Sequence, residues 1–355
     1  MVKHVLVMLD LFWIKSFYSE KSATMTASKL IKKTPAILAS TFFIATSASY
    51  ALETPSPSIS ALQDEIMWLK EETFVTTATK TQEDINKSGS SVSVITEQDL
   101  DLMGARNLMD ALKRSPGLGI SINYIGMPVI EVRGVKSDFS EKVLFLKNGH
   151  AINNNIVNGG ATTSHHNFLI DNIKRIEVVR GPGSALYGAN AFVAVINVIT
   201  KDAQDLQGTE VSVGLGHNET KKLNIQTSQQ LGSASYAFNA SLFDSDGFRE
   251  TVESDSLGTS GETNDWNKQF ELGLKVSHSN FKFQGHYSKR DAGPYIGIGN
   301  ALNDESTQNY AEYFLELAYT ETLAENLIFN QKIYNNNFKL KKGFYRKLPV
   351  EVQKK

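Results

Sequence analysis

The chain has 355 residues, no cysteine and a formal net charge of −2 at pH 7. The lack of cysteine excludes disulfides, thiol catalysis and cysteine-bound metals, and the near balance of charge argues against a nucleic-acid or anionic-membrane partner. The length is sufficient for two domains with a substantial core.

Residues 1–51 have the pattern of an export signal. Basic residues at 29–33 precede a short apolar run at 36–46, and Ser49–Ala51 resembles a signal-peptidase site. Met25 is the natural start of such a signal. No apolar run reaches the ~20 residues that a membrane-spanning helix needs. We therefore expect a cleaved signal peptide, with an uncleaved amphipathic anchor as the alternative.

Residues 52–90 are expected to hold a linker, a short amphipathic helix at 59–70 and an extended segment. The helix either packs on the domain that follows or has a signalling role. The extended segment consists of Glu72, Thr73, Phe74, Val75, Thr76, Thr77 and Ala78. Such a segment near a terminus can add as a strand to another protein's sheet edge. A plain polar linker is the alternative.

A strand, a glycine corner and a second strand are predicted over residues 176–200. The turn residues are Gly181, Gly183, Tyr187 and Gly188. Gly183 and Gly188 have the glycine spacing of a phosphate loop, but the Lys-Ser/Thr pair that should follow is absent and a β run takes the place of the helix. The residues thus favour a structural turn over a nucleotide site.

Residues 91–201 are expected to form an α/β domain with a small mixed sheet. Thr96 and Asp99 have the spacing of a helix capping box. A second helix is predicted at 105–114, and Asn148-Gly149 predicts a tight turn between strands. The expected strands are 92–96, 129–133, 142–147, 173–180 and 193–200.

Several ordered motifs in this region resemble the plug domain of TonB-dependent outer-membrane receptors. The motifs are Ser91–Thr96, Asn107–Leu112, Pro116-Gly117, Ile130–Gly134, Val143–Gly149, Ile173–Glu177 and Ile176–Gly188. The resemblance covers roughly residues 72–201. Lys147-Asn148 departs from the family's usual Asp before the glycine, and Phe192–Ala194 lacks its usual glycine. These departures concern local turns.

The resemblance implies roles for three groups of residues. Residues 72–78 correspond to the TonB box, which TonB recruits across the periplasm. Arg133, Glu177 and Arg180 lie within apolar strand runs, where charges are costly unless paired. In the family such plug charges face the inner barrel wall, which would make the contact polar and rearrangeable. An ion pair within the plug is the alternative.

Two polar loops of the plug hold weaker candidates for ligand binding. They are Tyr124, His165 and His166. The histidines are of a type that binds metal or haem iron, but adjacent residues on a strand point in opposite directions and no further ligand set is visible. Surface histidines are the favoured interpretation, so we expect no metal site and no cofactor.

Residues 208–340 alternate apolar and polar side chains in about seven strands of roughly ten residues. Short turns near 232–233, 277–280 and 321–326 alternate with long polar loops at about 245–266 and 291–309. This pattern predicts the N-terminal part of an antiparallel transmembrane β-barrel. A soluble β-sandwich is the alternative.

Plugged barrels of this type have about 22 strands, and the pattern here is followed by a charged tail at 341–355. We therefore expect an incomplete barrel, in a truncated N-terminal part of a receptor. The expected function is non-enzymatic uptake of a scarce ligand, most naturally a ferric siderophore, across the cell outer membrane. Its partners would be TonB, the ligand and outer-membrane lipid. A periplasmic plug-type binding module without transport and a non-functional fragment are the alternatives.

Overall fold

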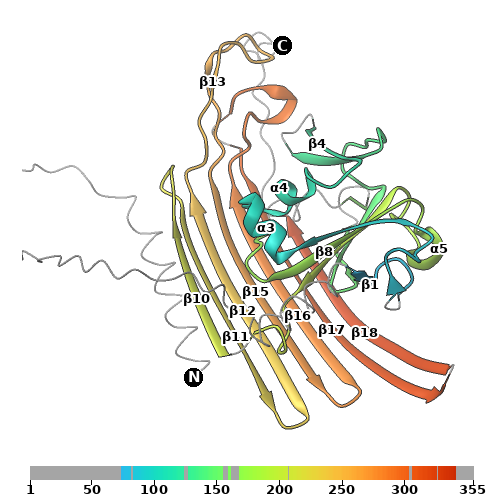
Figure 1. The fold of residues 1–355 in the computed structure, drawn as a ribbon. Coiled ribbons are helices and arrows are strands. Elements are labelled where there is room, and N and C mark those ends of the chain that lie inside the picture. Colours follow the sequence, from blue (N-terminus) through green and yellow to red (C-terminus); the bar gives the residue numbers. More distant parts are fainter. Residues whose placement is uncertain are drawn as a thin grey trace, which may run out of the picture. The chain divides into compact units, whose positions relative to one another are not determined.

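The computed structural model describes residues 73–80, 83–123, 127–154, 159–160, 168–206, 208–303, 306–325 and 327–340 (Figure 1). The elements of the α/β domain are β1 Phe74–Val75, β2 Glu83–Asp84, β3 Ser91–Thr96, α3 Glu97–Met103, α4 Leu108–Leu112, β4 Leu118–Ile122, β5 Pro128–Val132, β6 Val143–Lys147, β7 His150–Ala151, β8 Ile173–Arg180, α5 Ser184–Tyr187 and β9 Ala194–Thr200. The elements that follow are β10 Gly208–Leu215, β11 Lys221–Leu231, β12 Ala234–Ser245, β13 Thr251–Val252, β14 Gly261–Glu262, β15 Asn267–His278, β16 Phe281–Ala292, η2 Ile298–Asn300, β17 Gln308–Ala324 and β18 Leu327–Leu340.

The α/β domain is built on a five-stranded sheet with the order β3-β8-β9-β6-β7. β6 and β9 pair in parallel and the other pairs are antiparallel, so the predicted mixed sheet is confirmed. Successive side chains of a strand point to opposite faces, and here both faces are buried. The helices α3 and α4 cover one face, and the residues around β1 cover the other.

The two helices begin where the sequence supplies caps. Thr96 and Asp99 form the predicted capping box, in which each side chain accepts a hydrogen bond from the other's backbone N–H. α4 is shorter than the expected helix at 105–114, because Asn107 is extended and caps the helix two residues later. α4 ends at Leu112, and tighter turns continue the chain to Ser115, where the following Pro116 disfavours helical geometry. No helix among the described residues is long and apolar enough to cross a membrane.

The turn between β6 and β7 has the predicted geometry. Asn148 and Gly149 have φ angles of 50° and 77°. Positive φ at both central residues is the requirement of a type I′ turn, which Asn-Gly meets at low cost. The turn matters for the site because it holds Lys147 and His150 at its two ends.

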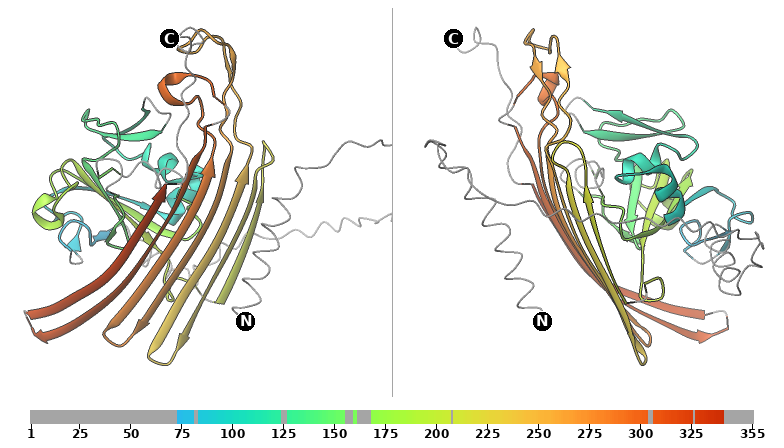
Figure 2. Two further views of the ribbon diagram at one scale, coloured as in Figure 1. Left: turned by 180° about the vertical axis from the view of Figure 1, so that it is seen from behind. Right: turned by 60° about the vertical axis from the view of Figure 1, so that its left-hand side comes forward.

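The second sheet has seven strands in the order β10-β11-β12-β15-β16-β17-β18, all antiparallel. Its strands run side by side and curve together (Figures 1 and 2). Two-residue turns connect the strands at one end. At the other end, β10 and β11 are joined by residues 216–220, and two long loops, one carrying β13 and β14, join the remaining strands. The seven strands and the alternation of short and long connections are as predicted.

The two faces of this sheet differ in polarity. Apolar side chains on one face are exposed, among them Val211, Val213, Leu215, Leu315, Leu317 and Ile333. Polar side chains on the other face are buried, among them Asn224, Gln226, Gln269, Glu271, His286 and Glu316. An apolar outward face with a polar inward face is the pattern of a membrane-spanning β-sheet.

Candidate functional site

The segment around β1 lies on the plug, and one carboxylate holds it there. Glu177 Oε2 accepts hydrogen bonds from the backbone N–H of Thr76 (3.0 Å) and Thr77 (2.8 Å). The same oxygen accepts from the hydroxyl of Thr77 at 2.5 Å and from that of Thr76 at 3.4 Å. The other oxygen, Oε1, is held by Arg175 Nε (2.9 Å) and Nη2 (2.8 Å). Glu177 has no exposed surface, so its charge is balanced entirely by these neighbours.

Further contacts fix the same segment. The Tyr187 hydroxyl donates to the carbonyl of Thr77 (2.9 Å), and Asn197 Nδ2 donates to the Thr77 hydroxyl (3.0 Å). Val75 is fully buried in an apolar cluster with Leu144, Leu146 and Val179 of the plug sheet. Burial and the neighbouring Glu177 charge raise the pKa of Tyr187 to about 12. The segment predicted to be extended is therefore a docked part of the plug.

The glycine corner brings Tyr187 to this contact. Gly181 and Gly188 have φ angles of 128° and 76°, which other residues rarely adopt. A Cβ on Gly183 would lie 2.9 Å from a methyl group of Val195, so this position needs glycine for packing. The corner is a structural turn, as the residues favoured, and α5 carries Tyr187 toward the docked segment.

Arg180 is also held within the plug. Its Nη1 donates to Ser115 Oγ (3.2 Å) and to the Pro116 carbonyl (3.0 Å), and its Nε donates to Ser91 Oγ (3.2 Å). Burial, and then the nearby charge of Arg133, lower the pKa of Arg180. Its partners are thus neutral oxygens of neighbouring plug segments.

Glu177 makes an ion pair within the plug, with Arg175, as in the alternative interpretation, whereas Arg180 bonds neutral oxygens of the plug and Arg133 is exposed after β5. Among the described residues, none of the three has a hydrogen bond or ion pair with the seven-stranded sheet. The physical reason is that Thr76, Thr77 and Arg175 already occupy the carboxylate that was expected to face the wall. Their contact with a barrel wall stays a prediction.

Other plug residues make the contact with the sheet, beginning with Lys147. Its Nζ lies 3.1 Å from His286 Nδ1, 3.8 Å from Glu271 Oε2 and 4.2 Å from the ring centre of Phe168. Its side chain is 4% exposed. Burial lowers the pKa of Lys147 to about 8, against an opposing effect of the Glu271 charge.

His150, at the other end of the β6–β7 turn, makes a second contact. Its Nδ1 lies 2.8 Å from Glu316 Oε2, and its Nε2 lies 2.9 Å from Asn336 Oδ1. The imidazole stacks on Phe314, with ring centres 4.1 Å apart and planes inclined by 15°. The turn therefore places a cation and an imidazole against two buried carboxylates of the sheet.

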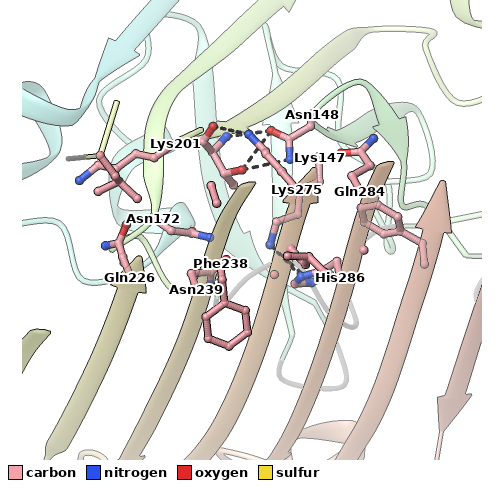
Figure 3. Close-up of a pocket in the computed structure, with 17 residues that line it drawn as sticks. Lys147, Asn148, Asn172, Lys201, Gln226, Phe238, Asn239, Lys275, Gln284 and His286 are labelled. Atoms are coloured by element: carbon pink, nitrogen blue, oxygen red, sulfur yellow. Dashed lines mark hydrogen bonds between the residues drawn. The ribbon is translucent and has the colours of Figure 1, made fainter. Parts of the chain in front are cut away.

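A cavity of about 20 Å³ lies beside the Lys147–His286 contact (Figure 3). Polar and basic side chains line it, including Lys147, Asn148, Lys275, Gln284 and His286. Lys275 Nζ bridges to the plug by donating to the Thr200 carbonyl at 2.5 Å. Apolar side chains, among them Leu206, Phe238 and Phe314, line the rest of the cavity. A cavity of this volume has room for about one water molecule.

Several predicted features lie outside the described residues. They are the signal region 1–51, the helix at 59–70, Glu72, the ligand candidates Tyr124, His165 and His166, and the tail 341–355. Within the part that is described, no group of three or more His, Asp or Glu side chains is arranged to hold a metal ion.

The predicted site did not include the residues that join plug and sheet. Lys147 was noted only as a departure from the family pattern, and His150 was not singled out. On the sheet, Glu271, His286 and Glu316 occupy inward positions of otherwise alternating strands. Charged residues at inward positions were the available signal, but the strand pattern alone does not say which plug residue faces them.

Comparison with known proteins agrees with this geometry. The family model described as TonB-dependent Receptor Plug Domain matches residues 84–195. The vitamin B12 transporter BtuB of Vibrio vulnificus is 29% identical over 255 residues, which cover 71% of this chain and 38% of the relative. The chain thus spans well under half the length of this relative.

Solved structures share the fold. The ferric-catecholate import receptor Fiu of E. coli K12 aligns with a TM-score of 0.55 at 17% identity, over 74% of this chain and 41% of that one. The siderophore receptor PiuA of Acinetobacter baumannii aligns with a TM-score of 0.56 at 17% identity, over 76% of this chain and 40% of that one. At this identity the likeness concerns the fold alone.

The mixed α/β domain contacts the polar face of a curved antiparallel sheet, and the opposite face of that sheet is apolar. This arrangement defines the class of plugged outer-membrane barrels. Within that class, residues 84–195 match the family model of the TonB-dependent receptor plug domain, and the seven-stranded sheet shares its fold with the barrel strands of the solved receptors. These relatives are named as a transporter and as receptors, and the exposed apolar face of the sheet fits an outer-membrane location.

Proposed function

We propose that this protein takes part in energy-coupled uptake of a scarce ligand across the outer membrane, with the plug closing the path and TonB supplying the force. The observation that carries the proposal is the plug domain at residues 84–195, preceded by the docked segment and followed by the membrane-type sheet. The polar contact between plug and sheet supports it, because such a contact can rearrange at low cost in water.

Residues 72–78 are the proposed coupling segment. Phe74 and Val75 form a short strand, and an extended chain can add to the sheet edge of a partner. A TonB-type partner would pull this segment, which is joined to the plug through β2 and β3. The force would therefore act on the domain that closes the path.

Two ligand classes are proposed. A ferric siderophore is the first, on the family resemblance of the plug. A cobalamin is the second, because the relative that is 29% identical over 255 residues is named a vitamin B12 transporter. Tyr124, His165 and His166 stay candidates for contact with either ligand.

The test replaces Val75 with proline in the receptor of its own host cells. Proline removes a backbone donor and prevents strand addition. We expect surface binding of radiolabelled ligand to survive while its uptake is lost. Val75→Thr keeps the N–H group and strand propensity, and serves as the control. Ferric siderophores and cobalamin are supplied separately, so the ligand that is imported identifies the class.

Unchanged uptake in Val75→Pro cells would contradict the coupling role. Fractionation addresses the wider proposal. Recovery of the protein as a soluble periplasmic species would favour the plug-type binding module instead. If cells with the unchanged protein neither bind nor take up either ligand, the non-functional fragment is favoured.

A further inference from the structure

The geometry points to Glu177 as the residue that positions the coupling segment, so we propose that its buried carboxylate sets how often residues 73–78 leave the plug. The inference rests on the proposed function in one respect: release of the segment matters for uptake only if a TonB-type partner captures it. The docking itself is a separate physical claim, because Glu177 was predicted to face a barrel wall and instead binds the segment.

The arrangement requires an ionised carboxylate. Oε2 faces four donors of Thr76 and Thr77, and Oε1 faces two donors of Arg175. A glutamine here has one acceptor oxygen and one NH2 donor. Whichever way the amide turns, its donor would face either the N–H groups of the segment or the guanidinium. Only a carboxylate satisfies both sides at once.

Neutral groups make further hydrogen bonds to the segment, among them the Ile85 N–H, which donates to the Thr73 carbonyl at 2.8 Å. Beyond the β1–β2 pairing, the Tyr187 hydroxyl and the Asn197 amide each contribute one hydrogen bond to Thr77. Hydrogen bonds to a charged group are roughly twice as strong as neutral ones. Glu177 therefore supplies the charge-assisted hydrogen bonds that hold Thr76 and Thr77 on the plug.

Docking and capture exclude each other. Val75 is fully buried and Thr77 is 1% exposed, so a strand-adding partner cannot reach their backbones in the docked state. The partner binds only the released fraction, and its apparent affinity falls by that fraction. Weakening the Glu177 contact should therefore increase capture without altering the captured sequence.

The first experiment measures hydrogen exchange of the purified 355-residue chain by mass spectrometry, with peptides that cover Thr76 and Thr77. In Glu177→Gln, we expect these amides to exchange at least about tenfold faster, the effect of losing a charged acceptor. A peptide from β9 should change by less than about twofold, which separates release of the segment from unfolding of the plug. Glu131→Gln, which alters a half-buried carboxylate on β5, is the matched control.

A second pair of variants leaves the sheet untouched. Thr77→Val removes the hydroxyl that lies 2.5 Å from Glu177 and that also accepts from Asn197 Nδ2, whereas Thr76→Val removes one at 3.4 Å from Glu177. We expect exchange to rise about fivefold or more in Thr77→Val and to stay within about twofold in Thr76→Val. If Glu177→Gln unfolds the plug, the comparison of the two threonine variants still tests whether the Glu177 contact holds the segment. Equal exchange in both threonine variants, or parent-like exchange in a folded Glu177→Gln chain, would overturn the inference.

Capture on the immobilised periplasmic domain of TonB separates this inference from the proposed function. We expect several-fold more Glu177→Gln chain than parent chain to be retained. If exchange rises as expected but neither chain is retained, Glu177 still positions the segment and the coupling role of residues 72–78 is wrong.

Discussion

Tyr187 and Lys147 show how strongly single side chains depend on their surroundings. Each is an ionisable group in a place from which folding has removed water, and each is held by a named partner: the Thr77 carbonyl for Tyr187, and Glu271 with His286 for Lys147. Desolvation disfavours the charged form of either group. The two residues therefore report, by titration, whether the docked segment and the plug–sheet contact are present in solution.

Tyr187 is expected to keep its proton to high pH. Its pKa is raised to about 12, so between pH 10 and 12 the folded state binds more protons than the unfolded state. Its stabilising contribution is complete below pH 10 and is lost as the pH rises through 12. The phenolate absorbance of the parent minus that of Tyr187→Phe should have its midpoint near pH 12. The same difference in denaturant should titrate near pH 10, and a midpoint near 10 in the folded chain would contradict the docked structure.

Lys147 is expected to give the opposite dependence. Its pKa is lowered to about 8 from 10.5, so between these values the unfolded state holds the proton that the folded state has lost. Stability should then rise with pH from 8 to 10.5, by up to roughly 3 kcal/mol. Lys147→Met should lack this rise in urea unfolding followed at several pH values. Lys113→Met, at an exposed position, should retain it. Parallel curves for the parent and Lys147→Met would exclude the burial described here.

At the scale of elements, sequence signals were reliable where the interacting residues are close neighbours in the chain. The Thr96–Asp99 capping box, the Asn148-Gly149 turn and the glycine corner each involve neighbours within a few residues. α4 was predicted too long, because Asn107 caps it from an extended conformation. An apolar and polar pattern specifies a helix face but marks its ends only loosely.

The α3 cap offers a direct test of this local control. Thr96→Ala removes the side chain that accepts from the Asp99 N–H (3.2 Å) and the hydroxyl that donates to its carboxylate (2.8 Å). We expect a loss of about 1 kcal/mol in the free energy of unfolding. Thr96→Ser keeps the hydroxyl and should stay close to the parent. A loss below about 0.3 kcal/mol in the alanine variant would show that the cap contributes little.

At the scale of the molecule, buried charges join the plug to the sheet, beside a smaller apolar contact of Met127 and Phe139 with Tyr310 and Phe338. Lys147 and His150 approach Glu271 and Glu316 from the two ends of one tight turn. Breaking such a pair leaves an unpaired buried charge, which is far more costly than the net stabilisation of the intact pair. The contact is thus specific in register, because each of these side chains has its partner at one position of the sheet.

A double-mutant cycle on His150 and Glu316 measures this contact. His150→Ala, Glu316→Gln and the double variant are compared by urea unfolding in detergent. We expect a coupling free energy of about 1–3 kcal/mol, because the two side chains lie 2.8 Å apart and both are buried. His217→Ala, at an exposed position, should change stability by less than about 0.5 kcal/mol. Additive effects would show that the two side chains do not interact.

The sequence by itself determined the elements and the family. Periodicity of two predicted the seven-stranded sheet, glycine and Asn-Gly predicted the turns, and ordered motifs predicted the plug. These features depend on residues close in the chain, whose geometry is fixed by backbone sterics and alternation.

Only the tertiary structure decided which charges meet. Glu177 is about 100 residues from Thr77 in the chain, and His150 is 166 from Glu316, yet both pairs lie within hydrogen-bond distance. A charge within an apolar run must find a partner, but the run does not say where that partner lies. Folding placed Glu177 against Thr76 and Thr77, and placed Lys147 and His150 among the residues that contact the seven-stranded sheet. The arrangement of the two sheets therefore decides which partner each buried charge meets.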